Sequence, residues 1–272
     1  MGERSAVAVL FDAVAETYDA VGVDFFQPIA HGLLDAVRPM PGERGLDVGC
    51  GRGAVLLALG GRVGPTGTAI GIDISPRMVE SAARAAAATG VRPGLVLGDA
   101  MDPPFAPATF DLVVSSLVLF FLPDPAQALR AWRDLLVPGG RVCVSTFGPY
   151  DERWRETVDE TLRRHATTAT PDARTTGAAG PFASDAGMEG LVADAGFDDI
   201  GTTLLDLRVV FDDAEQWQRW SMSVGQRQFW QAIPPDRLAD VRDEVFTAVE
   251  QCRHDDGTIG FHQRIRYTSG SR

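Results

Sequence analysis

Short apolar runs of strand length alternate with longer segments of helical periodicity through the first half of the chain. Five apolar runs predict strands at residues 44–48, 68–73, 94–97, 110–116 and 140–146. The segments between and before them predict helices at residues 27–38, 53–62, 76–88 and 125–136. Strands that alternate with helices in this way are typical of a parallel sheet that is covered by helices on both faces.

After Gly148 the pattern changes. An amphipathic helix is predicted at residues 151–166 and a mobile loop rich in Thr, Ala and Gly at residues 167–187. A second helix is predicted at residues 184–195 and a strand at residues 200–211. A helical insert at residues 212–256 and a last strand at residues 259–267 follow. We therefore expect three parts. Residues 1–148 would form a ligand-binding core with N-terminal cover helices, and residues 149–187 a helix and loop that could form a lid. Residues 188–272 would form the end of the sheet with its helical insert.

One turn carries most of the functional information. The strand that contains Asp47 runs into three glycines at alternate positions, Gly49, Gly51 and Gly53, and a helix-forming run follows. Glycine permits positive φ and lets the backbone approach a ligand closely. Backbone amides at the start of the following helix would face that ligand. The segment therefore predicts a strand, a glycine turn and a helix that together form a binding site.

Two classes of ligand use such a turn. Gly49, Gly51 and Ala54 fit the G-x-G-x-x-G/A pattern of dinucleotide-binding proteins, and Asp73 stands at about the required distance of 20 residues. However, the carboxylate of Asp47 would face the pyrophosphate of a dinucleotide unfavourably. A ligand with a cationic end and no phosphate, such as S-adenosylmethionine, suits the turn better.

Residues 47–53 match the E/D-x-G-x-G-x-G motif of the class I S-adenosylmethionine-dependent methyltransferases at every defined position. Four further segments resemble motifs of this family in the same order, at residues 71–78, 97–101, 110–116 and 136–142. The resemblance covers roughly residues 10–148 and is greatest to the small-molecule branch that includes the quinone-biosynthesis enzymes. It implies an α/β fold with a doubly wound, mostly parallel, seven-stranded Rossmann-like sheet and helical lid inserts.

The resemblance also implies roles for single residues. Asp73 would accept hydrogen bonds from the ribose hydroxyls, Asp99 would bind the adenine amino group, and Ser115 would lie at the methionine end. Tyr18, in the segment Phe11-Asp12-x-x-Ala-x-x-Tyr18-Asp19, would cover the cofactor, although its helical spacing equally allows it to pack inward. The expected cofactor contacts are Tyr18, Asp47, Gly49, Cys50, Gly51, Gly53, Asp73, Ile74, Met78, Gly98, Asp99, Ala100, Met101 and Ser115.

Composition narrows the partners and the environment. The net charge of −12 argues against nucleic acid or an anionic membrane surface as a partner. Cys50, Cys143 and Cys252 form neither a disulfide framework nor a metal-ligand pattern, so we expect no metal and a reducing cytoplasm. We recognise no signal peptide, and no apolar run approaches the ~20 residues of a membrane span. We expect a cytoplasmic monomer or homodimer that acts on a small molecule.

Candidate catalytic groups are few. His31, His254 and Tyr18 are weak candidates for a base, and the sequence contains no specific catalytic dyad. Methyl transfer from a sulfonium depends first on alignment and proximity. A base is needed only when the nucleophile is weakly acidic.

Two aromatic sets are candidates for the wall of an acceptor pocket. Phe120 and Phe121 follow the fourth predicted strand, and Trp217 and Trp220 lie three residues apart in the insert, on one face of a helix. Packing inside a lid would explain the two tryptophans equally well.

These patterns lead to one main hypothesis. The chain is expected to be an S-adenosylmethionine-dependent methyltransferase that acts on a small hydrophobic, natural-product-like metabolite, with methylation of oxygen favoured over carbon or nitrogen. The alternative is an enzyme of the same fold that binds the cofactor but catalyses a cyclisation or rearrangement. A non-catalytic binding module and a dinucleotide-dependent oxidoreductase agree less well with the motifs.

Overall fold

One sheet forms the centre of the part of the protein that the computed structural model describes, residues 6–18, 21–167 and 179–272. Its strands lie in the order β3-β2-β1-β4-β5-β7-β6. The strand bounds are β1 Arg44–Val48, β2 Thr68–Asp73, β3 Gly94–Leu97, β4 Phe110–Ser116, β5 Leu136–Tyr150, β6 Asp198–Phe211 and β7 Ile259–Ser271. In this order, each strand from β3 through β2, β1 and β4 to β5 is parallel to the next, and β7 is antiparallel to its neighbours β5 and β6. The predicted doubly wound, mostly parallel sheet is confirmed.

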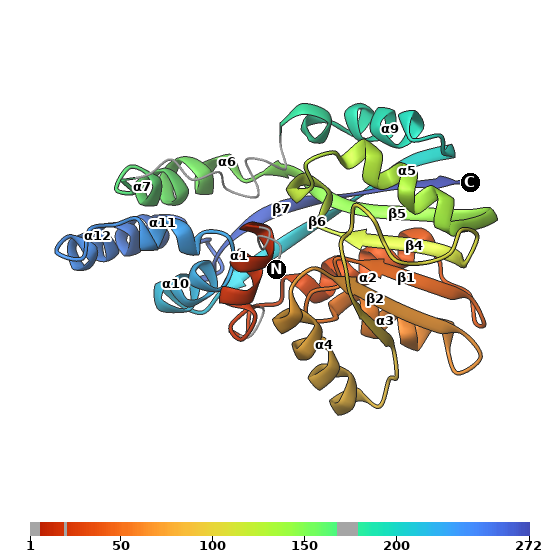
Figure 1. Ribbon diagram of the computed structural model, residues 1–272. Coiled ribbons are helices and arrows are strands. Elements are labelled where there is room, and N and C mark those ends of the chain that lie inside the picture. Colours follow the sequence, from red (N-terminus) through yellow and green to blue (C-terminus); the bar gives the residue numbers. More distant parts are fainter. Residues whose placement is uncertain (1–5, 19–20, 168–178) are drawn as a thin grey trace.

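Helices cover both faces of this sheet (Figure 1). One face carries α2 Phe26–Val37, α3 Ala54–Val63 and α4 Pro76–Thr89, and the other carries α5 Pro125–Leu135 and α9 Asp185–Asp194. A second group of helices extends beyond one end of the sheet, beside α1 Ala6–Val14. Its members are α6 Glu152–Trp154, the π-helical turn η2 Arg155–Asp159, α7 Glu160–Arg163, α10 Ala214–Ser223, α11 Arg227–Gln231 and α12 Leu238–Gln251.

Local sequence explains where several helices begin. Ser75, Asp124 and Ser184 precede α4, α5 and α9, and each side chain accepts a hydrogen bond from the backbone amide three residues later. Such N-caps satisfy amides that have no partner inside the helix. Pro76 and Pro125 occupy the first helical position, where a missing N–H costs nothing.

The structure differs from the sequence predictions in the second half of the chain. Strands β5 and β7 are longer than predicted because they pair with each other, from Arg141 opposite Ser271 to Tyr150 opposite Gln263. The helix predicted at 151–166 is interrupted by the π-helical turn η2. Part of the predicted mobile loop, residues 168–178, lies outside the described residues, and η3, Gly180–Ala183, follows it.

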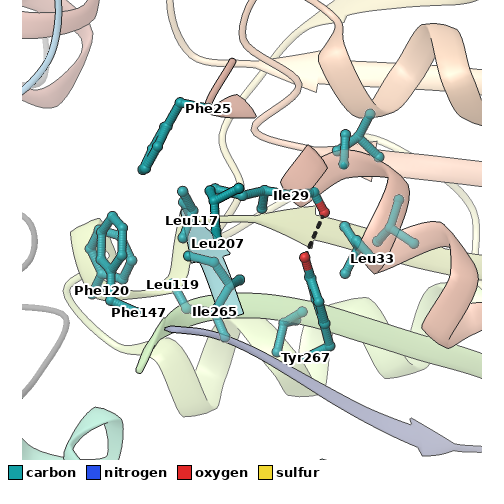
Figure 2. Close-up of a cluster of buried hydrophobic side chains, with 14 of the residues drawn as sticks. Phe25, Ile29, Leu33, Leu117, Leu119, Phe120, Phe147, Leu207, Ile265 and Tyr267 are labelled. Carbon is teal, nitrogen blue, oxygen red and sulfur yellow. Dashed lines mark hydrogen bonds between the residues drawn. The ribbon is translucent and has the colours of Figure 1, made fainter. Parts of the chain in front are cut away.

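Helix α2 packs closely on the sheet through a buried cluster (Figure 2). Ile29 and Leu33 of α2 contact the sheet side of this cluster, to which Ile265 and Tyr267 of β7 contribute. The buried Tyr267 hydroxyl donates a hydrogen bond to the Ile29 carbonyl at 3.1 Å. Gly32 makes this approach possible, because a Cβ atom at that position would lie 2.7 Å from Tyr267 Cζ.

Replacing Gly32 by alanine tests this close contact. We expect Gly32→Ala to lower the free energy of unfolding by about 1–2 kcal/mol, because overpacking outweighs the better helix propensity of alanine. The matched control is Gly61→Ala in α3, where an added Cβ meets no atom within 4 Å. That variant should be more stable by up to about 1 kcal/mol. Urea unfolding measures both, and equal effects of the two substitutions would contradict the packing argument.

Candidate active site

The carboxyl ends of β1 to β4 meet at one edge of the sheet and border a cavity of about 240 Å³. Open α/β sheets bind ligands outside this edge. All cofactor contacts expected from the sequence line the cavity except Gly53 and Ser115. Four strand ends that are distant in sequence therefore supply one binding surface.

The glycine turn combines two different constraints. Gly49, Gly51 and Gly53 all have positive φ, at 72°, 52° and 94°. A Cβ atom at Gly49 would collide with Val118, whereas a Cβ at Gly51 would meet no atom within 4 Å. Gly51 also lines the cavity, so the space beside it is available to a ligand. Gly53 does not line the cavity and is the residue that directly precedes α3.

Asp73 ends β2 with a carboxyl group that is held by backbone amides. Its oxygens accept hydrogen bonds from the amides of Gly51, at 2.8 Å, and Ser75, at 2.9 Å. Burial raises the pKa of Asp73, and these hydrogen bonds oppose the rise because they favour the charged form. The group is therefore fixed in place on the cavity wall, where the resemblance expects a ribose.

Asp47 is the least compensated group of the site. It is 1% exposed, and neither carboxyl oxygen has a hydrogen-bond partner among the described residues. Burial raises the pKa of Asp47 to about 8, and the Asp73 carboxylate adds to this rise. The Leu56 amide lies near but outside hydrogen-bonding geometry, and opposes it weakly. An unpaired buried carboxyl on a cavity wall is suited to a cationic ligand group.

The other end of the cavity lies beside β3. Asp99 is exposed and accepts a hydrogen bond from the Met101 amide at 2.8 Å, which fixes the direction of its carboxyl group. Trp132 Nε1 donates to the Ala100 carbonyl at 2.8 Å and holds the same turn from α5. A carboxyl that can accept from an amino group, next to apolar side chains, fits the adenine end of S-adenosylmethionine.

Ser115 does not reach the cavity. Its hydroxyl donates to the Val48 carbonyl at 2.8 Å within the sheet. Ser116 and Leu117 line the cavity instead. Leu117 has a φ of 57°, which is rare for a leucine, and its backbone turns the chain sharply at the end of β4. Alternation along a strand explains the difference, since a shift of one residue reverses the face to which a side chain points.

The N-terminal cover, which we define as α1 and the residues after it up to Tyr18, borders the cavity through Val7, Phe11 and Tyr18. Asp12 of α1 accepts a hydrogen bond from the Ser75 hydroxyl at 2.5 Å, and Val14 packs with Met78 of α4. The Arg52 guanidinium donates to the backbone carbonyl of Tyr18, so it fastens the segment after α1 to the glycine turn. Arg52 was not expected at the site, because its position in the turn motif carries no defined residue type.

A second cavity of about 120 Å³ adjoins the first. Tyr18, Phe121 and Leu117 line both, together with Phe11 and Phe26. The second wall is largely aromatic, and it includes Phe25, Phe120 and Phe147, which Figure 2 shows near Leu117. Helix α10 and the turn after it contribute Trp220, Val224, Gly225 and Gln226. Cover, sheet edge and insert thus enclose one apolar space beside the first cavity.

The structure separates the two tryptophans that the sequence placed together. Trp220 lines the second cavity, whereas Trp217 does not. Trp217 is fully buried, with ring centroids 6.2 Å from Trp154 and 5.9 Å from Trp230. Trp217 therefore lies in the core of the helical group beyond the sheet. The side chains of Trp217 and Trp220 leave α10 in directions that differ enough for them to contact different neighbours.

The histidines considered as bases lie away from both cavities. His31 is exposed on α2, and His254 Nε2 lies 3.2 Å from the Gly260 carbonyl in the turn before β7. His165 and His262 pair with Glu244 and Asp206 on the surface. Of the three candidate catalytic residues, the structure brings only Tyr18 to the cavities.

The described residues offer neither a metal site nor a membrane-spanning helix. Among residues 6–18, 21–167 and 179–272, no three His, Cys, Asp or Glu side chains are grouped to hold a metal ion. No helix in the same ranges combines the length and apolar character that a bilayer crossing requires.

Comparison with known proteins agrees with the geometry. The family described as "Methyltransferase domain" matches residues 46–144. Nocamycin O-methyltransferase of Saccharothrix syringae is 39% identical over 250 residues, which cover 87% of this chain and 88% of that protein. Aklanonic acid methyltransferase DauC of Streptomyces sp. (strain C5) is 42% identical over 144 residues, 53% of this chain and 66% of that protein.

A solved structure shares the fold. The YcgJ protein from Bacillus subtilis superposes with a TM-score of 0.59 at 19% identity, over 90% of this chain and 98% of that one. At this identity the likeness concerns the fold alone.

Substituting Asp47 by asparagine tests the unpaired carboxyl. Its folded-state pKa of about 8 exceeds the ordinary value of 3.8, so the folded protein retains a proton that the unfolded chain releases. Wild-type stability should therefore fall, relative to Asp47→Asn, as pH rises from about 4 to about 8, by up to about 1.4 kcal/mol per pH unit. Urea unfolding at several pH values measures this, and parallel curves for the two proteins would refute it. The variant should also bind S-adenosylmethionine about tenfold more weakly.

Gly51→Val tests the open space in the turn. The added side chain would enter the cavity, so we expect the dissociation constant of S-adenosylhomocysteine to rise by about 100-fold or more in calorimetry. Gly90→Val is the matched control, because Gly90 also has positive φ and open space but lies away from the cavity, after α4. It should lose comparable stability and keep its affinity. Tight binding by Gly51→Val would place the ligand elsewhere.

Proposed function

Because the chain belongs to the class I S-adenosylmethionine-dependent methyltransferases, we propose that it methylates an oxygen atom of a small, hydrophobic, natural-product-like acceptor. S-adenosylmethionine is its cofactor, and when bound this cofactor supplies an electrophilic methyl group on a sulfonium. Asp47 would pair with the ammonium group of its methionine part. Asp73 would bind the ribose, and Asp99 the adenine.

The aromatic cavity beside the cofactor site is the observation that carries this proposal. The rings of Phe11 and Phe121 stand edge to face at 5.3 Å between centroids, and those of Tyr18 and Phe26 lie 4.7 Å apart. Such a wall favours a flat apolar acceptor over a peptide or a polar metabolite. The shared residues would hold the acceptor next to the methyl group, and the enclosure would exclude water from the reacting atoms.

The helical group beyond the sheet would act as the lid of this space. Helix α10 and the following turn supply one wall, and Arg227 of α11 donates to the Ala13 carbonyl of the cover at 3.1 Å. We assign to this insert, and to the segment that contains α6 and α7, the closing of the acceptor site.

The side chains that line the second cavity bear on the acceptor's acidity. Among the described side chains that line this cavity, that of Tyr18 is the only ionisable one. An oxygen nucleophile needs a protein base only when it is weakly acidic. We therefore expect an acceptor with an acidic oxygen, such as a carboxyl, an enol or a phenol next to a carbonyl.

The names of two relatives agree with this class of reaction. Nocamycin O-methyltransferase is named for transfer to oxygen, and the second relative is named for methylation of aklanonic acid. The first name supports an oxygen nucleophile, and both names support a small-molecule acceptor of the natural-product type.

Incubation with S-adenosylmethionine and a panel of acceptors tests the proposal. The panel would hold polycyclic phenols and aromatic carboxylic acids, with matched aromatic amines as controls, and mass spectrometry would detect the methylated product and S-adenosylhomocysteine. We expect methyl esters or ethers and one S-adenosylhomocysteine per product. Methylation of the amines alone would contradict transfer to oxygen. Conversion of an acceptor to an isomer, with the cofactor unspent, would support the cyclase or rearrangement alternative.

A further inference from the structure

The acceptor cavity contains a polar group to which the proposed function gives no role. Gln226 lies between α10 and α11, lines the second cavity, and is 2% exposed. Its Oε1 atom is buried and has no hydrogen-bond partner among the described residues. A buried acceptor without a partner costs about 1–3 kcal/mol, so such an atom requires an explanation.

The orientation of this amide is fixed by its neighbour. Gln226 Nε2 donates a hydrogen bond to Asp159 Oδ1 at 2.8 Å, and Asp159 is itself buried. A carboxylate can only accept, so the NH₂ group must face Asp159, and Oε1 is the amide atom that remains for another partner. The hydrogen bond to a carboxylate also increases the negative charge on Oε1 and makes it a better acceptor.

The position of Asp159 in the chain supports a functional reading. It is the last residue of the π-helical turn η2, which interrupts the helix between α6 and α7. Turns of this type are rare and frequently lie at functional sites. The hydrogen bond from Gln226 therefore joins the two segments to which we assign the lid.

We propose that Gln226 Oε1 binds a hydroxyl or N–H group of the acceptor. The proposal rests on the proposed function, and it deepens it by naming the chemistry of one end of the acceptor. The partner must be a hydrogen donor, because Oε1 can only accept. It must also be uncharged or cationic, because the Asp159 carboxylate behind the amide would repel an anionic group. The acceptor therefore carries an uncharged or cationic donor group in addition to its apolar rings.

A pair of small aromatic probes tests this assignment. 1-Naphthol and 1-methylnaphthalene have nearly the same shape, and only the first can donate a hydrogen bond. Ligand-observed NMR titrations would use the protein saturated with S-adenosylhomocysteine. We expect the wild-type protein to bind 1-naphthol about tenfold more tightly. In Gln226→Leu this preference should disappear, while the affinity for S-adenosylhomocysteine should not change.

Two further variants complete the design. Gln228→Leu is the matched control, since Gln228 is a half-buried glutamine on the same wall, and it should keep the preference for 1-naphthol. The double variant Asp159→Asn/Gln226→Leu removes the carboxylate that the single substitution would leave without its amide partner. It should lose the preference as well, so the test stands even if Gln226→Leu folds poorly.

The outcomes separate the proposal from its premise. A preference that survives in both Gln226 variants, or that disappears in Gln228→Leu instead, would overturn the role of Gln226. Failure of the wild-type protein to bind either probe would overturn it too, together with the placement of the acceptor. S-adenosylmethionine turnover on the acceptor panel is measured independently and reports on the proposed function.

Discussion

An uncompensated carboxyl at the edge of the sheet is the constraint around which the site is arranged. Asp47 is held in the interior by its place in β1, next to the carboxyl of Asp73 and without a hydrogen-bond donor among the residues that the structure describes. Two acidic groups in one buried region oppose each other's ionisation and lower the stability of the empty protein. A cation that enters the cavity reverses this effect. The fold thus holds a buried acidic site that a cationic group would complete electrostatically, and the proposed function gives this role to the ammonium group of the cofactor.

The acceptor side depends on a different physical effect. Its wall is apolar and comes from segments that are distant in sequence: the cover that contains Phe11, the start of α2, the turn after β4, and the insert that contains Trp220. The hydrogen bond from Arg52 to Tyr18 holds the cover to the glycine turn, and the hydrogen bond from Arg227 to Ala13 holds it to α11 of the insert. In the proposed function this enclosure would supply alignment and dryness, which are the main requirements of methyl transfer from a sulfonium.

The sequence predicted the cofactor half of the protein far better than the acceptor half. Asp47, Gly51 and Asp73 could be placed because a strand, a turn and a helix follow one another locally, and parallel strands bring their ends to one edge. Ser115 was expected at the methionine end, but its hydroxyl is bonded to the Val48 carbonyl within the sheet, and the neighbouring Ser116 lines the cavity instead. The two tryptophans of α10 carry the same pattern, yet only packing against Trp154 and Trp230 places Trp217 in a core.

By itself, then, the chain determined its α/β class, its family and the residues of the glycine turn, since these depend on periodicity and on backbone requirements within short segments. Tertiary structure decided the long pairing of β5 with β7 and the hydrogen bond between Gln226 and Asp159, which are 67 residues apart. It also decided that the histidines lie away from the cavities. Contacts of that kind follow from how separate elements pack together. Neither local propensity nor motif spacing encodes them, because the partners become neighbours only after the chain has folded.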